Sequence, residues 1–316
     1  MTENAITKIQ YHVVIGGLGF IGTNLVNALI DRKTHNIVVI DDRSAESAIW
    51  GTKAHAALLD QWVNDGVVST SWSAFKSQGT KLADCDVTIY NLAACRKTMS
   101  DDTKRLWAIN VLFAEEVAYW ASKFGARLIH FSSGSVCNEA GNLRPVSPYG
   151  VSKLAGEYAV MKHRVNTPTL IVRPFNVYGK WQDFGPRGGV IARWAYALTH
   201  GQDVNIVDGT QLRAFTAVDA LIDAVLQNVE IGADGIISIL ASPPVRLWDV
   251  LQILISTANA STTVHYTPFR VADDPYTIRH AVGQDLSVAC DQEFTGSVYI
   301  PHPYISNVVH WYKELA

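Results

Sequence analysis

A glycine-rich turn near the start of the chain restricts the fold more than any other feature. An apolar run at residues 13–16 leads into GGLGFIG at residues 16–22, and a helix-like segment follows from residue 23 to residue 32. Gly16 permits a tight turn, Gly19 lets the backbone approach a pyrophosphate, and Gly22 allows close helix packing. The N-terminus of the helix then faces the anion. This order predicts a dinucleotide-binding βαβ unit.

A second apolar run, residues 37–40, ends in Asp41 and Asp42. At this place a βαβ unit presents a carboxylate to the hydroxyls of the adenosine ribose. Because a carboxylate repels a 2′-phosphate, we predict NAD rather than NADP as the cofactor. Arg43 follows directly and could partly offset that repulsion.

Short apolar runs alternate with longer segments that can hold helices along the first half of the chain. The runs that we expect to be strands are residues 13–16, 37–41, 67–71, 87–92, 128–132 and 169–173. Parallel strands need such crossover segments, so we predict an α/β fold with a Rossmann-type doubly wound parallel sheet. We place an NAD-binding domain at residues 1–179 and a smaller, mostly substrate-binding region at residues 180–316. Some segments of the second region are expected to return to the first domain.

Tyr149 and Lys153 lie four residues apart, which places them on one face of a helix. A lysine ammonium beside a phenol favours the phenolate. We therefore expect Lys153 to lower the pKa of Tyr149 toward the range in which a general base works.

The composition excludes several classes of function. The 26 basic and 29 acidic residues give a net charge of -3 without a basic run, so a nucleic-acid partner is not expected. No apolar stretch approaches the roughly 20 residues of a membrane span, and the polar N-terminus lacks a signal-peptide core, so we expect a cytoplasmic protein. Neither a disulfide nor a metal site is predicted, because the cysteines are scattered. They are Cys85, Cys95, Cys137 and Cys290.

Five motifs in order resemble the extended short-chain dehydrogenases/reductases, and more narrowly the branch of NAD-dependent nucleotide-sugar epimerases and dehydratases. They are GGLGFIG at 16–22, NLAA at 91–94, FSS at 131–133, YGVSK at 149–153 and RPFNVYG at 173–179. The resemblance implies an NAD site in the first domain. The cofactor-binding residues that it implies are Gly16, Gly19, Phe20, Ile21, Gly22, Asp41, Asp42, Leu92, Ala93, Ala94, Tyr149 and Lys153.

The same resemblance implies catalytic roles for three residues. Ser133 would hydrogen-bond the reacting sugar oxygen, Tyr149 would exchange its proton, and Lys153 would also hold the nicotinamide ribose. Substrate contacts are expected at Asn176, Arg213 and Arg279, with a UDP-sugar as the preferred ligand. Arg279 could equally be a solvated surface arginine.

The residues after Ser133 narrow the predicted reaction. Similar dehydratases carry an Asp-Glu pair there, and similar decarboxylases a glutamate at the second position, whereas this chain has Gly134 and Ser135. Neither can replace a carboxylate in proton transfer. We predict a nucleotide-sugar 4-epimerase. The alternatives are a keto-sugar reductase that uses NAD(P)H, a dehydratase of the same family, and a non-catalytic NAD-binding sensor or scaffold.

Two further features concern assembly and substrate choice. Apolar residues recur at helical spacing, and the resemblance implies a homodimer through two such helices, although packing on the sheet must claim part of these faces. The residues are Leu106, Ile109, Phe113, Val117 and Trp120, then Leu154, Tyr158 and Met161. Three departures from the family pattern, Ser71, Cys137 and Ala214, indicate an unusual ligand pocket.

Overall fold

The computed structural model describes residues 8–43, 47–78, 82, 84–96, 103–137, 143–145, 147–186, 188–207, 209–239, 244–267 and 302–315. Arg279 and Cys290 lie outside these residues. Within them, a seven-stranded parallel sheet has the strand order β11-β6-β5-β4-β1-β2-β3. The strands are β1 (Gln10–Ile15), β2 (Ile37–Ile40), β3 (Val68–Thr70), β4 (Asp86–Asn91), β5 (Arg127–Phe131), β6 (Thr169–Pro174) and β11 (Gly235–Ile239). The predicted fold class is confirmed, and the predicted strands lie close to their expected places.

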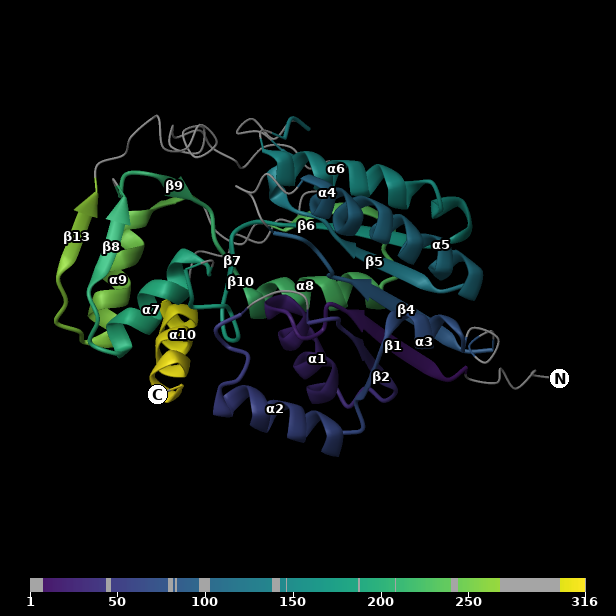
Figure 1. Cartoon of the computed structure of the whole chain (residues 1–316), viewed down its shortest axis with the longest axis horizontal. Coiled ribbons are helices and arrows are strands. Elements are labelled where there is room, and N and C mark those ends of the chain that lie inside the picture. The colour runs from purple at the N-terminus through teal and green to yellow at the C-terminus, as the bar shows by residue number, and fades with distance from the viewer. Residues whose placement is uncertain are drawn as a thin grey trace.

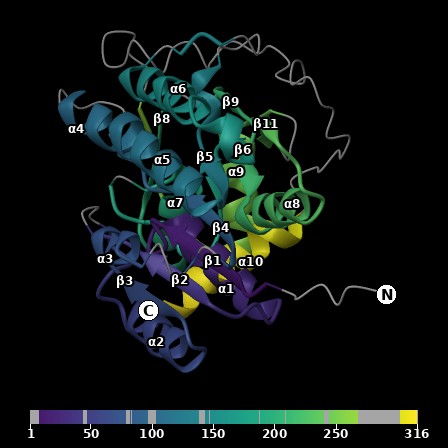
Figure 2. The same ribbon diagram turned by 90° about the vertical axis from the view of Figure 1, so that its right-hand side faces the viewer.

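Helices cover both faces of the sheet (Figure 1). One face carries α1 (Phe20–Asp31), α2 (Lys53–Asn64) and α8 (Val218–Glu230), and the other carries α3 (Trp72–Lys76), α5 (Ala114–Phe124) and α6 (Pro148–Met161). Because neighbouring side chains of a strand point to opposite faces, Val13 packs under α5 while Val14 packs under α1. Figure 2 shows the same layers from the side, with α5 and α8 on opposite sides of the strands.

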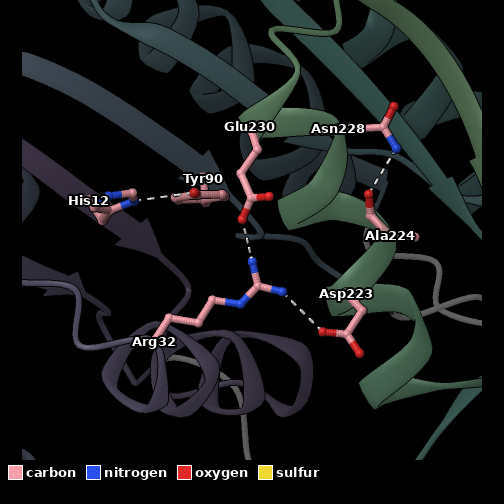
Figure 3. A network of polar contacts seen from close by, with 7 residues as sticks. All are labelled: His12, Arg32, Tyr90, Asp223, Ala224, Asn228 and Glu230. Carbon is pink, nitrogen blue, oxygen red and sulfur yellow. Dashed lines mark hydrogen bonds and ion pairs between the residues drawn. The ribbon is translucent and has the colours of Figure 1, made fainter.

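Polar contacts connect α1 to α8 and strand β1 to strand β4 (Figure 3). Arg32, just after the end of α1, pairs with Glu230 at 2.6 Å and with Asp223 at 3.2 Å. These partners are exposed, so each pair contributes little to stability. His12 Nδ1 lies 3.2 Å from the Tyr90 hydroxyl across the sheet. The apolar core rather than these pairs therefore holds α1 and α8 in place.

A smaller region forms a second apolar core. It is built from α7 (Val190–Thr199), β8 (Val204–Val207), α9 (Leu247–Ala258), β13 (Val264–Thr267) and α10 (His302–Glu314). Short strand pairs join β7 (Val177–Tyr178) to β10 (Thr216–Ala217) and β9 (Leu212–Arg213) to β12 (Val245–Arg246). By contrast, β11 and α8 lie on the central sheet although they follow residue 180.

The segment after β7 is tied to both cores by hydrogen bonds. Asn24 donates to the carbonyl of Lys180 at 2.8 Å, and the Asp183 carboxylate accepts from the amide of Ala48 at 2.9 Å. The Tyr312 hydroxyl donates to the carbonyl of Gln182 at 2.7 Å. These contacts fix where the smaller region meets the sheet.

The helical residues 103–124 only partly present the apolar face that was expected to meet a partner. The chain from residue 103 to residue 124 forms α4 (Thr103–Trp107), a π-helical segment η2 (Ala108–Phe113) and α5 in succession. Leu106 and Val117 are fully buried in the fold, so they are not available to a partner. Leu112, in the π-helical segment, is 63% exposed. None of the described helices has the length and apolar character needed to cross a membrane.

Candidate active site

The glycine turn forms a cradle at the carboxyl end of β1. The amide of Gly16 donates to the carbonyl of Ile40 at 2.7 Å, and Gly16 has a positive φ of 80°. A Cβ atom on Gly16 would lie 2.9 Å from the amide nitrogen of Ala93, and one on Gly22 would lie 2.2 Å from the carbonyl oxygen of Gly16. Only glycine fits at both places. The cradle leaves the N-terminus of α1 open to a pyrophosphate, so these residues fit NAD.

The carboxylate of Asp41 lies beside this cradle, at the end of β2. It accepts hydrogen bonds from the amides of Leu18, at 3.0 Å, and Arg43, at 2.8 Å. Burial raises the pKa of Asp41, and the two amides oppose that effect. Trp50, which the sequence did not single out, donates its ring N–H to the Leu18 carbonyl at 3.1 Å. Both the N–H and the carbonyl of Leu18 are thus hydrogen-bonded. The remaining lone pairs of the Asp41 carboxylate can accept from ribose hydroxyls.

Ser133, Tyr149 and Lys153 gather where β5 meets helix α6. Ser133 caps the short 3-10 helix η3 (Gly134–Val136), with its hydroxyl accepting from the amide of Ser135 at 3.1 Å. Helix α6 begins at Pro148, and Ser147 caps it by accepting from the Gly150 amide at 3.0 Å. This cap fixes the first turn, in which Tyr149 lies.

Lys153 lies one turn farther along α6 and is 1% exposed. Its ammonium donates to the carbonyl of Phe131 at 2.6 Å. Burial lowers the pKa of Lys153 to about 8, and the charge of Glu157 opposes that effect. Lys153 is therefore still mostly charged at neutral pH.

Burial raises the pKa of Tyr149, whereas a hydrogen bond with Ser133 and the charge of Arg96 lower it. The sequence predicted Lys153 for the lowering role; in the structure, the described groups that lower this pKa are Ser133 and Arg96. Arg96 is an exposed residue after β4 that the sequence did not single out. Its position depends on the fold, since it approaches Tyr149 from a distant part of the chain.

Asn110 is a second residue that the motifs missed. It is fully buried in η2, and its amide bonds both the N–H of Cys95, at 2.8 Å, and the carbonyl of Cys95, at 3.0 Å. It also donates to Ser152 at 2.9 Å, and Ser152 donates to the carbonyl of Tyr149 at 2.7 Å. This chain of bonds fixes the residue before Arg96 relative to helix α6. A polar amide inside the apolar run of residues 108–113 was the available signal.

The predicted substrate residues lie on segments that meet beyond the sheet. Asn176 has a positive φ of 36°, and its side chain donates to the carbonyl of Ala214 at 2.8 Å. Ala214 directly follows Arg213, so the fold brings these two predicted contacts together. Arg213 donates to the carbonyl of Leu212 at 2.9 Å. Their roles toward a substrate stay predictions, and so does that of Arg279, which is outside the described residues.

The three departures from the family pattern have structural roles. Ser71 caps α3 by accepting from the amide of Ala74 at 3.2 Å. Cys137 is buried, and its amide donates to the carbonyl of Gly134 at 3.0 Å. Ala214 is 1% exposed and presents its carbonyl to Asn176. Within the described residues, no group of His, Cys, Asp and Glu could hold a metal ion.

Comparison with known proteins identifies the family once this geometry is known. The model of the NAD-dependent epimerase/dehydratase family matches residues 12–239. The chain belongs to this family. The predicted family, the predicted class of enzyme and the predicted NAD cofactor are thereby confirmed.

Two curated relatives and one solved structure illustrate the range of activities among similar proteins. The chain is 28% identical to a UDP-N-acetyl-alpha-D-glucosaminuronate decarboxylase of Bacillus cytotoxicus, over 81% of this chain and 83% of the relative. It is 29% identical to a UDP-glucose 4-epimerase of Mycolicibacterium smegmatis, over 67% and 71%. A UDP-N-acetylglucosamine 4-epimerase from Methanobrevibacter ruminantium M1, solved with UDP-N-acetylmuramic acid, shares the fold with a TM-score of 0.79 at 22% identity, covering 98% of this chain and all of that one.

Replacing Arg96 with glutamine tests its effect on Tyr149. Loss of the positive charge should raise the pKa of Tyr149, so the acid-side limb of the pH profile of kcat/KM for a nucleotide sugar should move to higher pH. We expect a shift of less than about one pH unit, because charges at exposed positions are screened by water and salt. The shift should shrink further in 0.5 M salt.

Lys33→Gln is the matched control, since it removes one exposed positive charge at the far end of α1. Its pH profile should equal that of the wild type. An identical profile for Arg96→Gln would show that Arg96 does not act on the phenol.

Proposed function

We propose that this protein is an NAD-dependent nucleotide-sugar 4-epimerase that prefers a UDP-sugar. The observation that supports this most is the grouping of Ser133, Tyr149 and Lys153 at the carboxyl end of β5, in the same parallel sheet as the glycine cradle after β1, with no carboxylate at residues 134 and 135. Such a site can move one proton at one sugar oxygen. It offers no acid–base pair for elimination of water.

The surroundings of Gly134 support the choice of reaction. A Cβ atom at this position would lie 2.4 Å from the ring of Phe175. A side chain that ends in a carboxylate therefore cannot be accommodated there while Phe175 keeps its place. This contact argues against a dehydratase, whose reaction needs acidic side chains after Ser133.

Each residue has a defined task in the proposed reaction. Ser133 donates a hydrogen bond to the oxygen on the sugar C4 carbon, and Tyr149 removes the proton from that 4-hydroxyl. The Lys153 ammonium holds the nicotinamide ribose, while Ser133 and Arg96 are the described groups that favour the phenolate. NAD, when bound, supplies the acceptor and donor of the C4 hydride. The 4-keto sugar then rotates in the site, so that the hydride returns to the opposite face of C4. Tyr149 returns the proton to the oxygen, and the configuration at C4 is inverted without net redox change.

We further propose that residues 180–316 mostly bind the substrate. Arg213 suits a diphosphate because a guanidinium can bind phosphate oxygens in a bidentate way. Asn176 lies beside it, and Arg279 is the remaining candidate. Two curated relatives are named for UDP-sugars, which supports uridine as the base, whereas a third, 26% identical, is an ADP-L-glycero-D-manno-heptose-6-epimerase. A cytoplasmic location remains a prediction.

The first test is to purify the protein without added cofactor, measure bound NAD, and follow UDP-sugars by NMR. Without added reductant, the protein should interconvert at least one of two pairs. These are UDP-glucose with UDP-galactose, and the N-acetyl forms of the two with each other. Turnover only with NAD(P)H and a keto-sugar would indicate the reductase instead. UDP-glucuronate and its N-acetyl form should be included, because the Bacillus cytotoxicus relative is a decarboxylase. Release of carbon dioxide from either sugar would identify the protein as a decarboxylase and refute the epimerase assignment.

The variant Tyr149→Phe should lose about 10²- to 10⁴-fold in kcat, the usual contribution of a positioned general base. NAD binding, measured by calorimetry, should persist because the glycine cradle is unchanged. Tyr158→Phe is the control, since Tyr158 is 65% exposed on the same helix. Full activity of Tyr149→Phe would refute the catalytic assignment, and NAD binding without any turnover by the wild type would favour a sensor.

We also propose a homodimer that forms through η2, α5 and α6. Large exposed apolar side chains lie along these helices: Leu112, Tyr119, Val151 and Tyr158. Exposed apolar surface of this kind marks interaction sites. In light scattering, Tyr158→Glu should halve the mass of the wild type, because a buried unpaired charge is costly.

Ile231→Glu is the control for this dimer, since Ile231 is 79% exposed just after α8. Its mass should equal that of the wild type. A wild-type mass of one chain at all protein concentrations would contradict the dimer.

A further inference from the structure

A buried ion pair lies one helical turn beyond Lys153. The side chains of Glu157 and Arg173 are 4% and 9% exposed. The guanidinium donates Nε to Oε1 at 2.8 Å and Nη2 to Oε2 at 2.6 Å. Ser132 donates its hydroxyl to the same Oε1. Both oxygens of the Glu157 carboxylate therefore have donors, and the side chain has one fixed position.

Stability alone is a weak reason for this pair. Two charges lose their hydration on burial, and apolar replacements of a buried ion pair are often neutral or stabilising. The pair lies at the carboxyl ends of β5 and β6, under the helix that carries the catalytic residues. Its place indicates a role in the site rather than in the core.

The end of β5 contacts α6 at three successive turns. The three pairs are Ser133 with Tyr149, the Phe131 carbonyl with Lys153, and Ser132 with Glu157. The helical members recur every four residues, so they share one face of α6. Glu157 thus belongs to the same row as the proposed base and its lysine.

Lys153 is charged in a place that disfavours charge. Burial lowers its pKa to about 8, and the carboxylate of Glu157 is what opposes burial. His130 on β5 does not help, because burial and the charge of Lys153 hold its pKa well below the ordinary value and keep it neutral. The titratable and charged groups on the elements around Lys153 are Tyr149 and Glu157 on α6, His130 on β5, Arg173 on β6, and Cys95 and Arg96 after β4. Among these described groups, Glu157 is the one carboxylate.

We propose that Glu157, held by Arg173 and Ser132, is a positioning residue whose fixed carboxylate, one helical turn from Lys153, keeps the Lys153 ammonium charged. Arg173 fixes the carboxylate, and the carboxylate retains the lysine proton. A neutral Lys153 would remove the positive charge that lies one helical turn from Tyr149. The inference rests on the proposed function in taking Lys153 as part of the catalytic site.

Glu157→Gln removes the charge while it keeps the size of the side chain. Lys153 can be followed directly by NMR of protein labelled with [13C]lysine, with its signal assigned from Lys153→Met. In the wild type we expect it to titrate near pH 8. In Glu157→Gln it should titrate roughly one pH unit lower, as is typical when a nearby opposite charge is lost. The alkaline limb of the kcat/KM profile should move down by the same amount.

Two further variants separate this role from a structural one. Glu157→Asp keeps the charge on a shorter side chain, so its Lys153 should titrate between those of the wild type and Glu157→Gln. Thr169→Val removes a buried hydroxyl at the other end of β6, which donates to the Thr167 carbonyl at 2.7 Å. It should lower the melting temperature without moving the Lys153 titration.

An unchanged Lys153 titration in folded Glu157→Gln would overturn the proposal. Should that variant not fold, an unchanged titration in folded Glu157→Met, which also lacks the charge, would overturn it equally. The NMR titration does not depend on turnover. A shifted Lys153 in a protein that epimerises no sugar would therefore refute the proposed function and leave the role of Glu157 standing.

Discussion

The contact between the end of β5 and helix α6 is the interaction on which the site depends. Strand β5 lies inside the sheet with neighbours on both sides, and the Phe131 side chain packs into the core on the α1 face. The carbonyl of the same residue binds Lys153, and the next two residues bind α6 as well. The catalytic geometry thereby acquires the rigidity of the most buried part of the fold.

Burial acts against the charged form of both proposed catalytic groups. It raises the pKa of Tyr149 and lowers that of Lys153. Each ionised form therefore needs a partner that offsets burial. Ser133 and Arg96 favour the phenolate, and Glu157 favours the ammonium. The polar side chains around the site are thus distributed so that the phenolate and the ammonium each have a partner that offsets burial.

The features that were predictable from sequence are local ones. The strand–turn–helix at residues 13–32 and Asp41 follow from neighbouring residues, because a turn of this kind needs glycine at fixed places. The catalytic set needed more, since Ser133 was assigned through the family resemblance rather than through its own spacing. The structure then confirmed the sheet that brings these motifs to one edge.

Residues that act through tertiary contacts were not predictable in this way. Asn110 joins Cys95 to α6 across 15 residues, and Arg173 meets Glu157 from a different strand. Neither pairing has a spacing that a pattern could detect. Leu106 and Val117, two members of the expected helical face, are buried within the chain itself. Apolar periodicity shows that a face exists, but whether the sheet or a partner covers it depends on the packing.

The segment of residues 173–176 links the type of reaction to substrate recognition. Arg173 holds Glu157, the ring of Phe175 occupies the space that a side chain at residue 134 would need, and Asn176 turns with a positive φ to reach Ala214. A carboxylate at residue 134 would require a smaller residue 175. Such a change would fall directly before Asn176, in the same segment. The reaction type in this fold is therefore constrained by a packing contact as much as by the catalytic residues themselves.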